Sequence, residues 1–329
     1  MRTFDYSRPG DPQQAVIQHQ HADSAAYLAG GTTLLDLVKL DVMQPAQLVD
    51  INPLPLKQIE PLSDGRLRIG ALVTNTDLAN HPLVREHYAV LSEALLAGAS
   101  TQLRNKATTG GNVMQRVRCS YFRDGISPCN KREPGSGCAA IKGNNRNVHA
   151  VLGTSEQCIA AHPSDMCVAM AAIGAKVLVS GPKGMREIDF LDFHLLPGNT
   201  PEKEHALGDD ELITHVILDA PLKGSRSSYL KLRDRTSYQF ALASSAVILT
   251  LSEDGKQIRE ARIALGGVGT KPWRAKEAEA ALMGQPAQIT TFEQVARLAF
   301  KEAKAYSQNA FKIPLGQQAI VRNLRDLTA

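Results

Sequence analysis

Apolar and polar positions alternate with two different periods along this chain, and the changes of period divide it into three sections. In the first section, three short apolar runs rich in β-forming residues are separated by two helical patterns. The runs cover residues 3–9, 25–31 and 47–52, and the helical patterns cover residues 12–19 and 32–40. Three prolines then interrupt residues 52–62, which indicates a boundary. We therefore predict a first unit over residues 1–55.

The second and third sections also mix strands with helices. The second, residues 56–222, has strand patterns at 66–72 and 176–190 and helical patterns at 74–84, at 90–100 and after His162. The third, residues 223–329, has alternating strands at 246–251 and 257–265 around a Ser-Glu-Asp-Gly-Lys turn, and then helices. These sections together predict an α+β protein.

One C-terminal helix has a distinct apolar face. Thr290 and Glu293 form a candidate capping box at its start. The apolar positions that follow at helical spacing are Phe292, Val295, Ala296, Ala299, Phe300, Ala303 and Tyr306. We expect this face to pack on the strands of the third section.

Four of the five cysteines lie in one irregular segment rich in Gly, Pro, Asn and Ser. Their spacing is Cys119-x9-Cys129-x8-Cys138-x19-Cys158. Connections of this length without structure of their own are uncommon inside a compact domain. Four thiolates around zinc or an iron-sulfur cluster would order the segment. Since there is no C-x-x-C pair, single buried cysteines remain the alternative.

The fifth cysteine, Cys167, belongs to a different pattern. Ser164 or Asp165 can cap a helix there, and Met166, Met170 and Ile173 recur at helical spacing. We predict that Cys167 is a core residue. We also predict a structural role for His162, because no nucleophile or second base stands beside it in the sequence.

The cysteine segment is strongly basic. Between residues 104 and 146, nine Lys or Arg residues stand against two carboxylates, a local net charge of +7. The nine are Arg104, Lys106, Arg116, Arg118, Arg123, Lys131, Arg132, Lys142 and Arg146. Zinc and a 4Fe-4S cluster are both anionic when four thiolates hold them, so charge does not choose between them.

The remaining composition excludes several classes of protein. The chain has 329 residues and a net charge of only +4, which does not favour a general nucleic-acid role. No apolar run approaches the roughly 18 residues of a membrane span, and the first residues have neither an apolar signal region nor twin arginines. We expect a soluble protein that stays in the cytoplasm or is exported with a partner that carries the signal.

Two Gly-Gly motifs are suited to close contact with a polar ligand. In the first, a strand from Tyr27 enters Gly30-Gly31 and then Thr32-Thr33 at the start of an apolar helix, an arrangement that suits a pyrophosphate. It is neither G-x-G-x-x-G nor a P-loop, which argues against a Rossmann nicotinamide site and a kinase-type ATP site. The second motif, residues 108–113, immediately precedes the cysteines.

Four stretches together resemble a known family. AGGTTLLDLVK, TTGGNV, HPSDMCVAMAAIGAKV and YLKLRDRTSYQFALASSAV are similar to the FAD-binding subunit of the molybdenum hydroxylases, the xanthine dehydrogenase and carbon monoxide dehydrogenase group. The inserted RCSYFRDGISPCNKREPGSGCAAIKG resembles the iron-sulfur version of that subunit in periplasmic aldehyde oxidoreductases. The resemblance implies a two-part p-cresol methylhydroxylase-type FAD-binding domain, with the insertion at about residues 115–160, and a C-terminal domain of the CO dehydrogenase flavoprotein type.

The resemblance also implies roles for particular residues. The FAD pyrophosphate would be cradled by Tyr27, Leu28, Ala29, Gly30, Gly31, Thr32, Thr33 and Leu34. Thr108, Gly111 and Asn112 would contact the phosphates or the flavin side of FAD. Asp165 would bind a ribose or ribityl hydroxyl, and Ile213 would pack near the adenine. Lys231 would reach the flavin or its linker. A 4Fe-4S cluster would be held by Cys119, Cys129, Cys138 and Cys158. Core, capping and surface roles are the alternatives for Ile213, Asp165 and Lys231.

The activity implied by the resemblance is electron transfer within a larger complex. A large molybdenum-cofactor partner would oxidise an aldehyde to a carboxylic acid, a small partner with two 2Fe-2S clusters would pass the electrons on, and FAD would deliver them to an acceptor. The resemblance implies a periplasmic heterotrimer with no catalytic residue in this chain, and we expect Lys131 and Arg132 to dock a partner. The alternatives are a four-cysteine nucleic-acid-binding module and a self-contained flavin oxidase.

Overall fold

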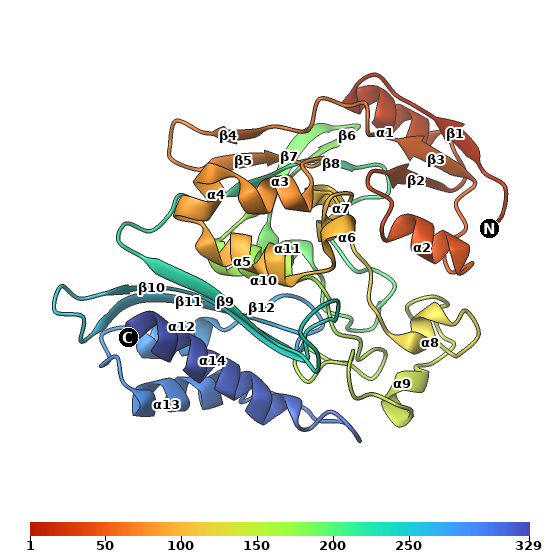
Figure 1. Ribbon diagram of the computed structural model, residues 1–329. Coiled ribbons are helices and arrows are strands. Elements are labelled where there is room, and N and C mark those ends of the chain that lie inside the picture. Colours follow the sequence, from red (N-terminus) through yellow and green to blue (C-terminus); the bar gives the residue numbers. More distant parts are fainter.

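The computed structural model describes all 329 residues, which form three sheets with helices between and beside them (Figure 1). The strands are β1 (Asp5–Ser7), β2 (Ala25–Leu28), β3 (Gln47–Asp50), β4 (Ile59–Pro61), β5 (Leu67–Gly70), β6 (Lys176–Gly181), β7 (Gly184–Asp189), β8 (Leu212–Leu218), β9 (Arg226–Leu232), β10 (Ala243–Leu251), β11 (Ile258–Gly266) and β12 (Trp273–Arg274). The helices are α1 (Pro12–Gln20), α2 (Leu34–Lys39), α3 (Asn75–Asn80), α4 (Pro82–His87), α5 (Ala89–Ala97), α6 (Thr101–Arg104), α7 (Thr109–Val113), α8 (Ser120–Arg123), α9 (Ala139–Lys142), α10 (Asp165–Ile173), α11 (Phe190–Phe193), α12 (Lys276–Leu282), α13 (Ile289–Ala299) and α14 (Lys312–Thr328).

Each sheet takes its strands from one section of the chain. The first has the order β1-β3-β2 with parallel neighbours. The second, β4-β5-β8-β6-β7, and the third, β12-β11-β10-β9, are antiparallel. The exact domain boundaries at residues 55 and 222 stay predictions.

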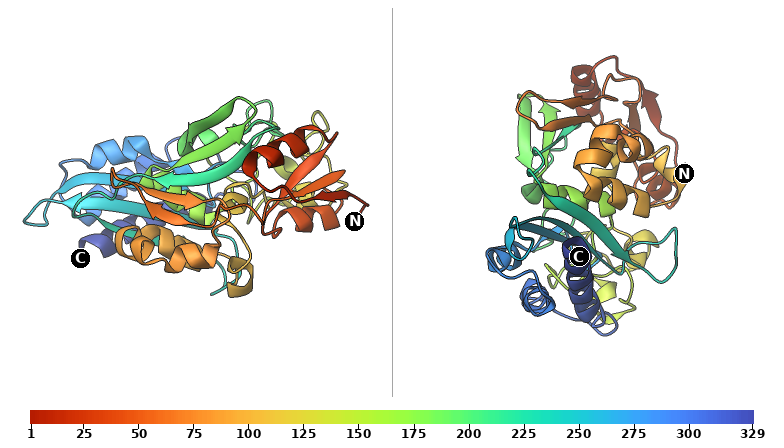
Figure 2. Two further views of the ribbon diagram at one scale, coloured as in Figure 1. Left: turned by 90° about the horizontal axis from the view of Figure 1, so that it is seen from above. Right: turned by 60° about the vertical axis from the view of Figure 1, so that its left-hand side comes forward.

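The third sheet is covered on both faces, because its strands alternate between two cores. Along β10, Ala246 and Ile248 join the core that contains α5 and α10, whereas Val247 and Leu249 join the core that contains α12, α13 and α14. Figure 2 shows α14 lying along this sheet, with the carboxyl terminus at its end. This period of two is what the alternating sequence predicts.

The capping-box prediction at the C-terminal helix is wrong. The helix α13 begins at Ile289, and its N-cap is Gln288, two residues before Thr290, with no side-chain capping bond. It also ends at Ala299, so that Ala303 and Tyr306 lie beyond it. Phe300 packs on Gly316 of α14, and the Lys304 N–H then bonds the carbonyl oxygen of Val151 at 2.8 Å. These tertiary contacts replace the next helical turn.

The cysteine segment lies beside the sheets rather than within them. Its regular structure is limited to the single turns α8 and α9, drawn in yellow and yellow-green in Figure 1. No helix of the chain combines the length and the apolar composition that a membrane span requires.

Candidate cofactor sites

The first Gly-Gly turn packs directly against the backbone that leads into the second. A Cβ on Gly30 would lie 2.0 Å from the carbonyl oxygen of Lys106, so only glycine fits there. Gly31 has φ +74°, a left-handed conformation that also favours glycine. Thr33 is the N-cap of α2, but its hydroxyl makes no capping bond and instead accepts a hydrogen bond from Arg118 at 3.4 Å. The two Gly-Gly motifs are therefore neighbours in space.

The second Gly-Gly motif forms the short helix α7. Thr108 caps it by accepting a hydrogen bond from the Gly111 N–H at 3.2 Å. The Asn112 Oδ1 accepts a hydrogen bond from the Ser164 hydroxyl at 2.9 Å, and Ser164 in turn caps α10 through the Cys167 N–H at 3.1 Å. The helix predicted after His162 and its Ser164 cap are thus confirmed. Gly111 is exposed, which leaves its face accessible to a ligand.

Asp165 and Lys231, two predicted FAD residues, contact each other. The Lys231 ammonium lies 2.7 Å from Asp165 Oδ2, and the Tyr229 hydroxyl donates to Asp165 Oδ1 at 2.6 Å. The side chain of Lys231 is only 3% exposed. Burial, followed by the charge of Asp165, raises the pKa of Tyr229 well above its usual value, so this hydroxyl stays a donor. The charged groups of Asp165 and Lys231, both predicted to contact FAD, therefore already contact each other.

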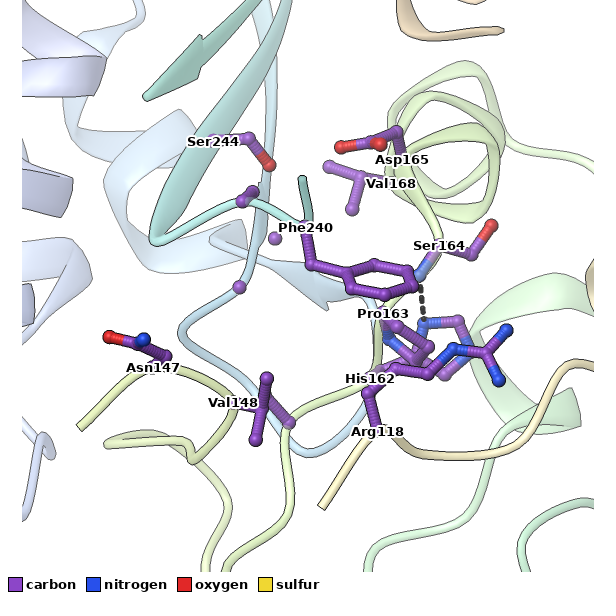
Figure 3. Close-up of a pocket in the computed structure, with 14 residues that line it drawn as sticks. Arg118, Asn147, Val148, His162, Pro163, Ser164, Asp165, Val168, Phe240 and Ser244 are labelled. Atoms are coloured by element: carbon purple, nitrogen blue, oxygen red, sulfur yellow. Dashed lines mark hydrogen bonds between the residues drawn. The ribbon is translucent and has the colours of Figure 1, made fainter. Parts of the chain in front are cut away.

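A pocket opens beside this network (Figure 3). Its walls include Arg118, His162, Ser164, Asp165 and Phe240. Of the predicted FAD residues, only Asp165 lines it. Ile213 lies elsewhere, on β8 within a core cluster, and is 5% exposed. Asn112 is linked to Asp165 through the neighbouring Ser164, and β8, the strand of Ile213, packs against α7. The role of Ile213 at the adenine stays a prediction.

The first turn retains an unsatisfied polar atom that fits a ligand such as FAD. The Tyr27 hydroxyl is buried and has no hydrogen-bond partner, although its ring stacks on His19 at 4.4 Å. Burial raises the pKa of Tyr27 well above its usual value, so the hydroxyl is a proton donor. A buried donor of this kind takes its partner from water or from a ligand.

The four clustered cysteines surround one cavity. Cys119, Cys129, Cys138 and Cys158 all line it. Cys129 and Cys138 are paired directly in an isolated antiparallel bridge, and the cysteines share a small core with Phe122. This arrangement brings together residues from four places in an irregular segment, as a site for a metal or cluster requires.

These thiols must lose their protons before they can hold a metal or cluster. Burial raises the pKa of Cys119 to about 12 and that of Cys158 to about 11, so both are protonated at neutral pH without a metal. A metal or cluster would displace these protons and compensate the buried thiolates. His149 Nε2 lies 3.2 Å from Cys119 Sγ, a position from which it can donate a hydrogen bond to a ligating thiolate.

The prediction that Lys131 and Arg132 dock a partner is wrong. The Lys131 ammonium is buried, donating to the carbonyl oxygen of Pro201 at 2.7 Å and pairing with Glu204 at 3.2 Å. Arg132 donates to the carbonyl oxygens of Tyr121 and Phe122, each at 2.8 Å. Arg132 therefore holds the segment together, and Lys131 ties it to Pro201 and Glu204. Lys142 remains exposed.

We expect Lys131→Glu to destabilise the protein. It would place two carboxylates together in a buried site, and breaking a buried ion pair costs about 3–5 kcal/mol in free energy of unfolding. Lys142→Glu makes the same change of charge on an exposed side chain and should cost little. Urea unfolding of both variants measures the difference. Equal unfolding midpoints would contradict the internal role of Lys131.

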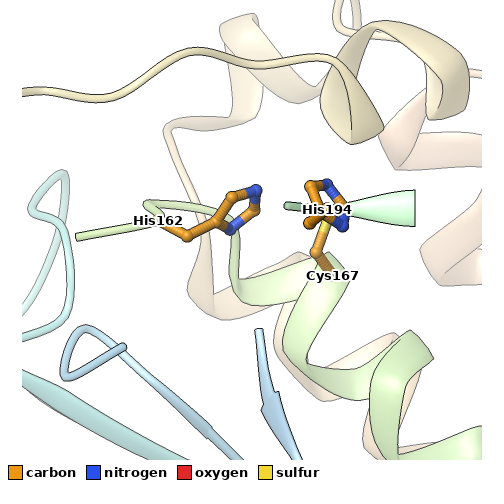
Figure 4. A group of neighbouring side chains, drawn as sticks. All are labelled: His162, Cys167 and His194. Atoms are coloured by element: carbon orange, nitrogen blue, oxygen red, sulfur yellow. The ribbon is translucent and has the colours of Figure 1, made fainter. Parts of the chain in front are cut away.

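A second group of potential ligands lies in the core. His162, Cys167 and His194 place their ligand atoms within 4.8 Å of one another (Figure 4). His194 Nε2 faces the carbonyl oxygen of Val113 at 3.1 Å and so carries the proton, whereas His162 Nδ1 accepts from the Ser164 N–H at 3.4 Å. The two remaining nitrogens, Nε2 of His162 and Nδ1 of His194, are buried and have no hydrogen-bond partner. Cys167 is 0% exposed, which confirms it as a core residue.

Several residues at these sites were not singled out for such roles from the sequence. Tyr229 was detectable in principle, because it precedes Lys231 by two positions and therefore lies on the same face of β9. No comparable spacing in the sequence indicates a site role for Arg118 or His149. Glu204, which pairs with Arg116 and Lys131, lies far from both in the chain.

Comparisons with known proteins give consistent matches along the whole chain. The family described as the FAD-binding domain in molybdopterin dehydrogenase matches residues 2–221, and the CO dehydrogenase flavoprotein C-terminal domain matches residues 228–325. The aldehyde oxidoreductase FAD-binding subunit PaoB of Escherichia coli K12 is 49% identical over 100% of this chain and 99% of its own length. The nicotinate dehydrogenase FAD-subunit of Eubacterium barkeri is 27% identical over 89% of this chain and 84% of its own.

Solved structures agree with these sequence matches. A carbon monoxide dehydrogenase structure from Hydrogenophaga pseudoflava contains a chain with a TM-score of 0.77 and 26% identity, which covers 99% of this chain and 97% of its own length. The predicted resemblance and the predicted fold class are both confirmed.

Proposed function

Because the chain belongs to the family of FAD-binding domains of molybdopterin dehydrogenases and is an oxidoreductase subunit, we propose that it is the electron-transfer flavoprotein of an aldehyde oxidoreductase complex. The observation that carries the proposal is the 49% identity, over the whole chain, to an aldehyde oxidoreductase FAD-binding subunit. The orphaned Tyr27 hydroxyl and the adjoining Gly-Gly turns support a bound cofactor. The paired cations of the cysteine segment do not favour the nucleic-acid-binding alternative.

The second part of the proposal is a 4Fe-4S cluster held by Cys119, Cys129, Cys138 and Cys158. All four line one cavity. Zinc with Zn–S bonds of about 2.3 Å would draw four sulfurs to within about 3.8 Å of one another. Only the group of His162, Cys167 and His194 brings three potential ligand atoms within 4.8 Å, so the clustered cysteines are more widely spread than zinc requires. This spacing favours a larger group, a cluster of several iron atoms.

We propose two partners, a small subunit with 2Fe-2S clusters and a large subunit with the molybdenum cofactor. Oxidation of an aldehyde to a carboxylic acid, with the added oxygen taken from water, releases two electrons and two protons, and the clusters would carry the electrons one at a time. FAD accepts electrons singly or in pairs, which would connect the clusters to an external acceptor. The chain would contribute binding and orientation of its cofactors and no catalytic side chain.

Two measurements test this function. The purified chain should show flavin absorption with a broad iron-sulfur shoulder. An aldehyde should reduce its flavin only when both partner subunits are added. Flavin reduction by aldehyde in the isolated chain would instead support a self-contained oxidase, and a spectrum without flavin would contradict the proposal.

The compartment is a further proposal. The cysteine insertion resembles that of periplasmic aldehyde oxidoreductases, so we propose export to the periplasm in complex with a partner that carries the signal. Cell fractionation should find the chain in the periplasm only while that partner keeps its signal. A chain that stays with the cytoplasm in both cases would contradict co-export.

A further inference from the structure

Arg118 connects the first Gly-Gly turn to the cysteine segment. Its Nη2 lies 3.4 Å from the Thr33 hydroxyl, and its guanidinium lies over the Phe240 ring at 5.2 Å from the ring centre. The side chain is only 16% exposed and lines the cavity of Figure 3. Arg118 also immediately precedes Cys119, so one peptide bond joins it to a candidate cluster ligand.

The charge of Arg118 is incompletely matched within the protein. Asp36 is its nearest carboxylate, at 3.9 Å, but the same Asp36 oxygen lies 2.7 Å from the Arg123 guanidinium. Two guanidinium groups therefore share one carboxylate. A buried cation of this kind needs an anion that the described side chains do not supply.

The other acid in the cavity is already paired. Asp165 lies 2.7 Å from the Lys231 ammonium and accepts a hydrogen bond from Tyr229. It is therefore not free to neutralise Arg118. The Thr33 hydroxyl, by contrast, makes no capping bond within α2 and lies beside Arg118. A guanidinium and a hydroxyl side by side are suited to the oxygens of a phosphate.

We infer that Arg118 binds the pyrophosphate of FAD, together with Thr33. The inference rests on FAD binding by this chain and adds a cation from the cysteine segment to the predicted glycine cradle. Because Arg118 and Cys119 are adjacent, the segment that forms the cysteine cavity also contributes to the FAD site. The competing role for Arg118 is purely structural, as a partner of Asp36.

Separate variants that remove the positive charge of Arg118 and the negative charge of Asp36 distinguish FAD binding from a purely structural role. Arg118→Gln should weaken FAD binding by about 10- to 100-fold, the usual range for a hydrogen bond to a charged group. Asp36→Asn removes the competing carboxylate and should leave FAD binding equal or tighter. Lys142→Gln removes an exposed charge from the same segment and should change nothing. Fluorescence titration of the flavin-depleted, full-length chain with FAD measures each dissociation constant.

The outcomes separate this inference from the proposed function. Iron content and circular dichroism establish that each variant is folded. Failure of the wild-type chain to bind FAD would overturn the function itself. Parallel loss of affinity in Arg118→Gln and Asp36→Asn would assign Arg118 to the structural role. Unchanged affinity in Arg118→Gln with a lower flavin reduction potential would place the guanidinium at the flavin ring, and would also overturn the pyrophosphate assignment.

Discussion

A folded Gly31→Val protein should have lost most of its FAD. Gly31 has φ +74°, and a side chain in this left-handed region costs about 1–2 kcal/mol. A Cβ there would also lie 2.9 Å from Leu35 Cδ1 and 3.3 Å from Leu28 Cδ1. The branched side chain would therefore distort the turn at the predicted pyrophosphate. Each 1.4 kcal/mol of lost binding free energy weakens FAD about tenfold.

A matched control separates this effect from backbone strain alone. Gly184 has φ +100° in the turn between β6 and β7, and no atom lies within 4 Å of a Cβ built there. Gly184→Val should therefore lower stability yet retain its flavin. The flavin absorbance of the purified variants, relative to protein, measures occupancy. Full occupancy in folded Gly31→Val would reject the assignment of this turn to FAD.

Local chemistry in the sequence was sufficient to predict several features of these sites. Ser164 caps α10 because a hydroxyl next to an apolar helix satisfies a free N–H, and the sequence shows both. Gly30 and Gly31 likewise signal a turn where a side chain does not fit. Such features depend on neighbours a few residues apart, and they do not need the fold to be known.

Charge pairing could not be predicted in this way. Counting charges between residues 104 and 146 gives a basic segment, and it suggested a surface for a partner. Instead Lys131 reaches Glu204 and Arg123 reaches Asp36, both far away in the sequence. Whether a cation faces solvent or an acid depends on which distant elements pack against it. The same limit hid the contact between Asp165 and Lys231, which were predicted separately.

Cys129→Ser and Cys138→Ser should each lose their iron and loosen the cysteine segment, whereas Cys167→Ala should keep its iron. The first two cysteines line the common cavity and form a backbone bridge with each other. A serine hydroxyl replaces a soft thiolate poorly as a ligand. Cys167 lies in the core around α10 and makes no part of that cavity. Its truncation should cost about 1 kcal/mol of packing.

Metal analysis and limited trypsin digestion measure these two effects. The segment contains Lys131, Arg132 and Lys142, so trypsin should cut it much faster once a cluster ligand is lost. Cys167→Ala should resist trypsin as the wild-type protein does, which controls for general loss of stability. Wild-type iron content in both cluster variants would show that these cysteines are not the ligands. Stoichiometric zinc in the wild-type protein would instead replace the cluster with a single ion, despite the wide spread of the sulfurs.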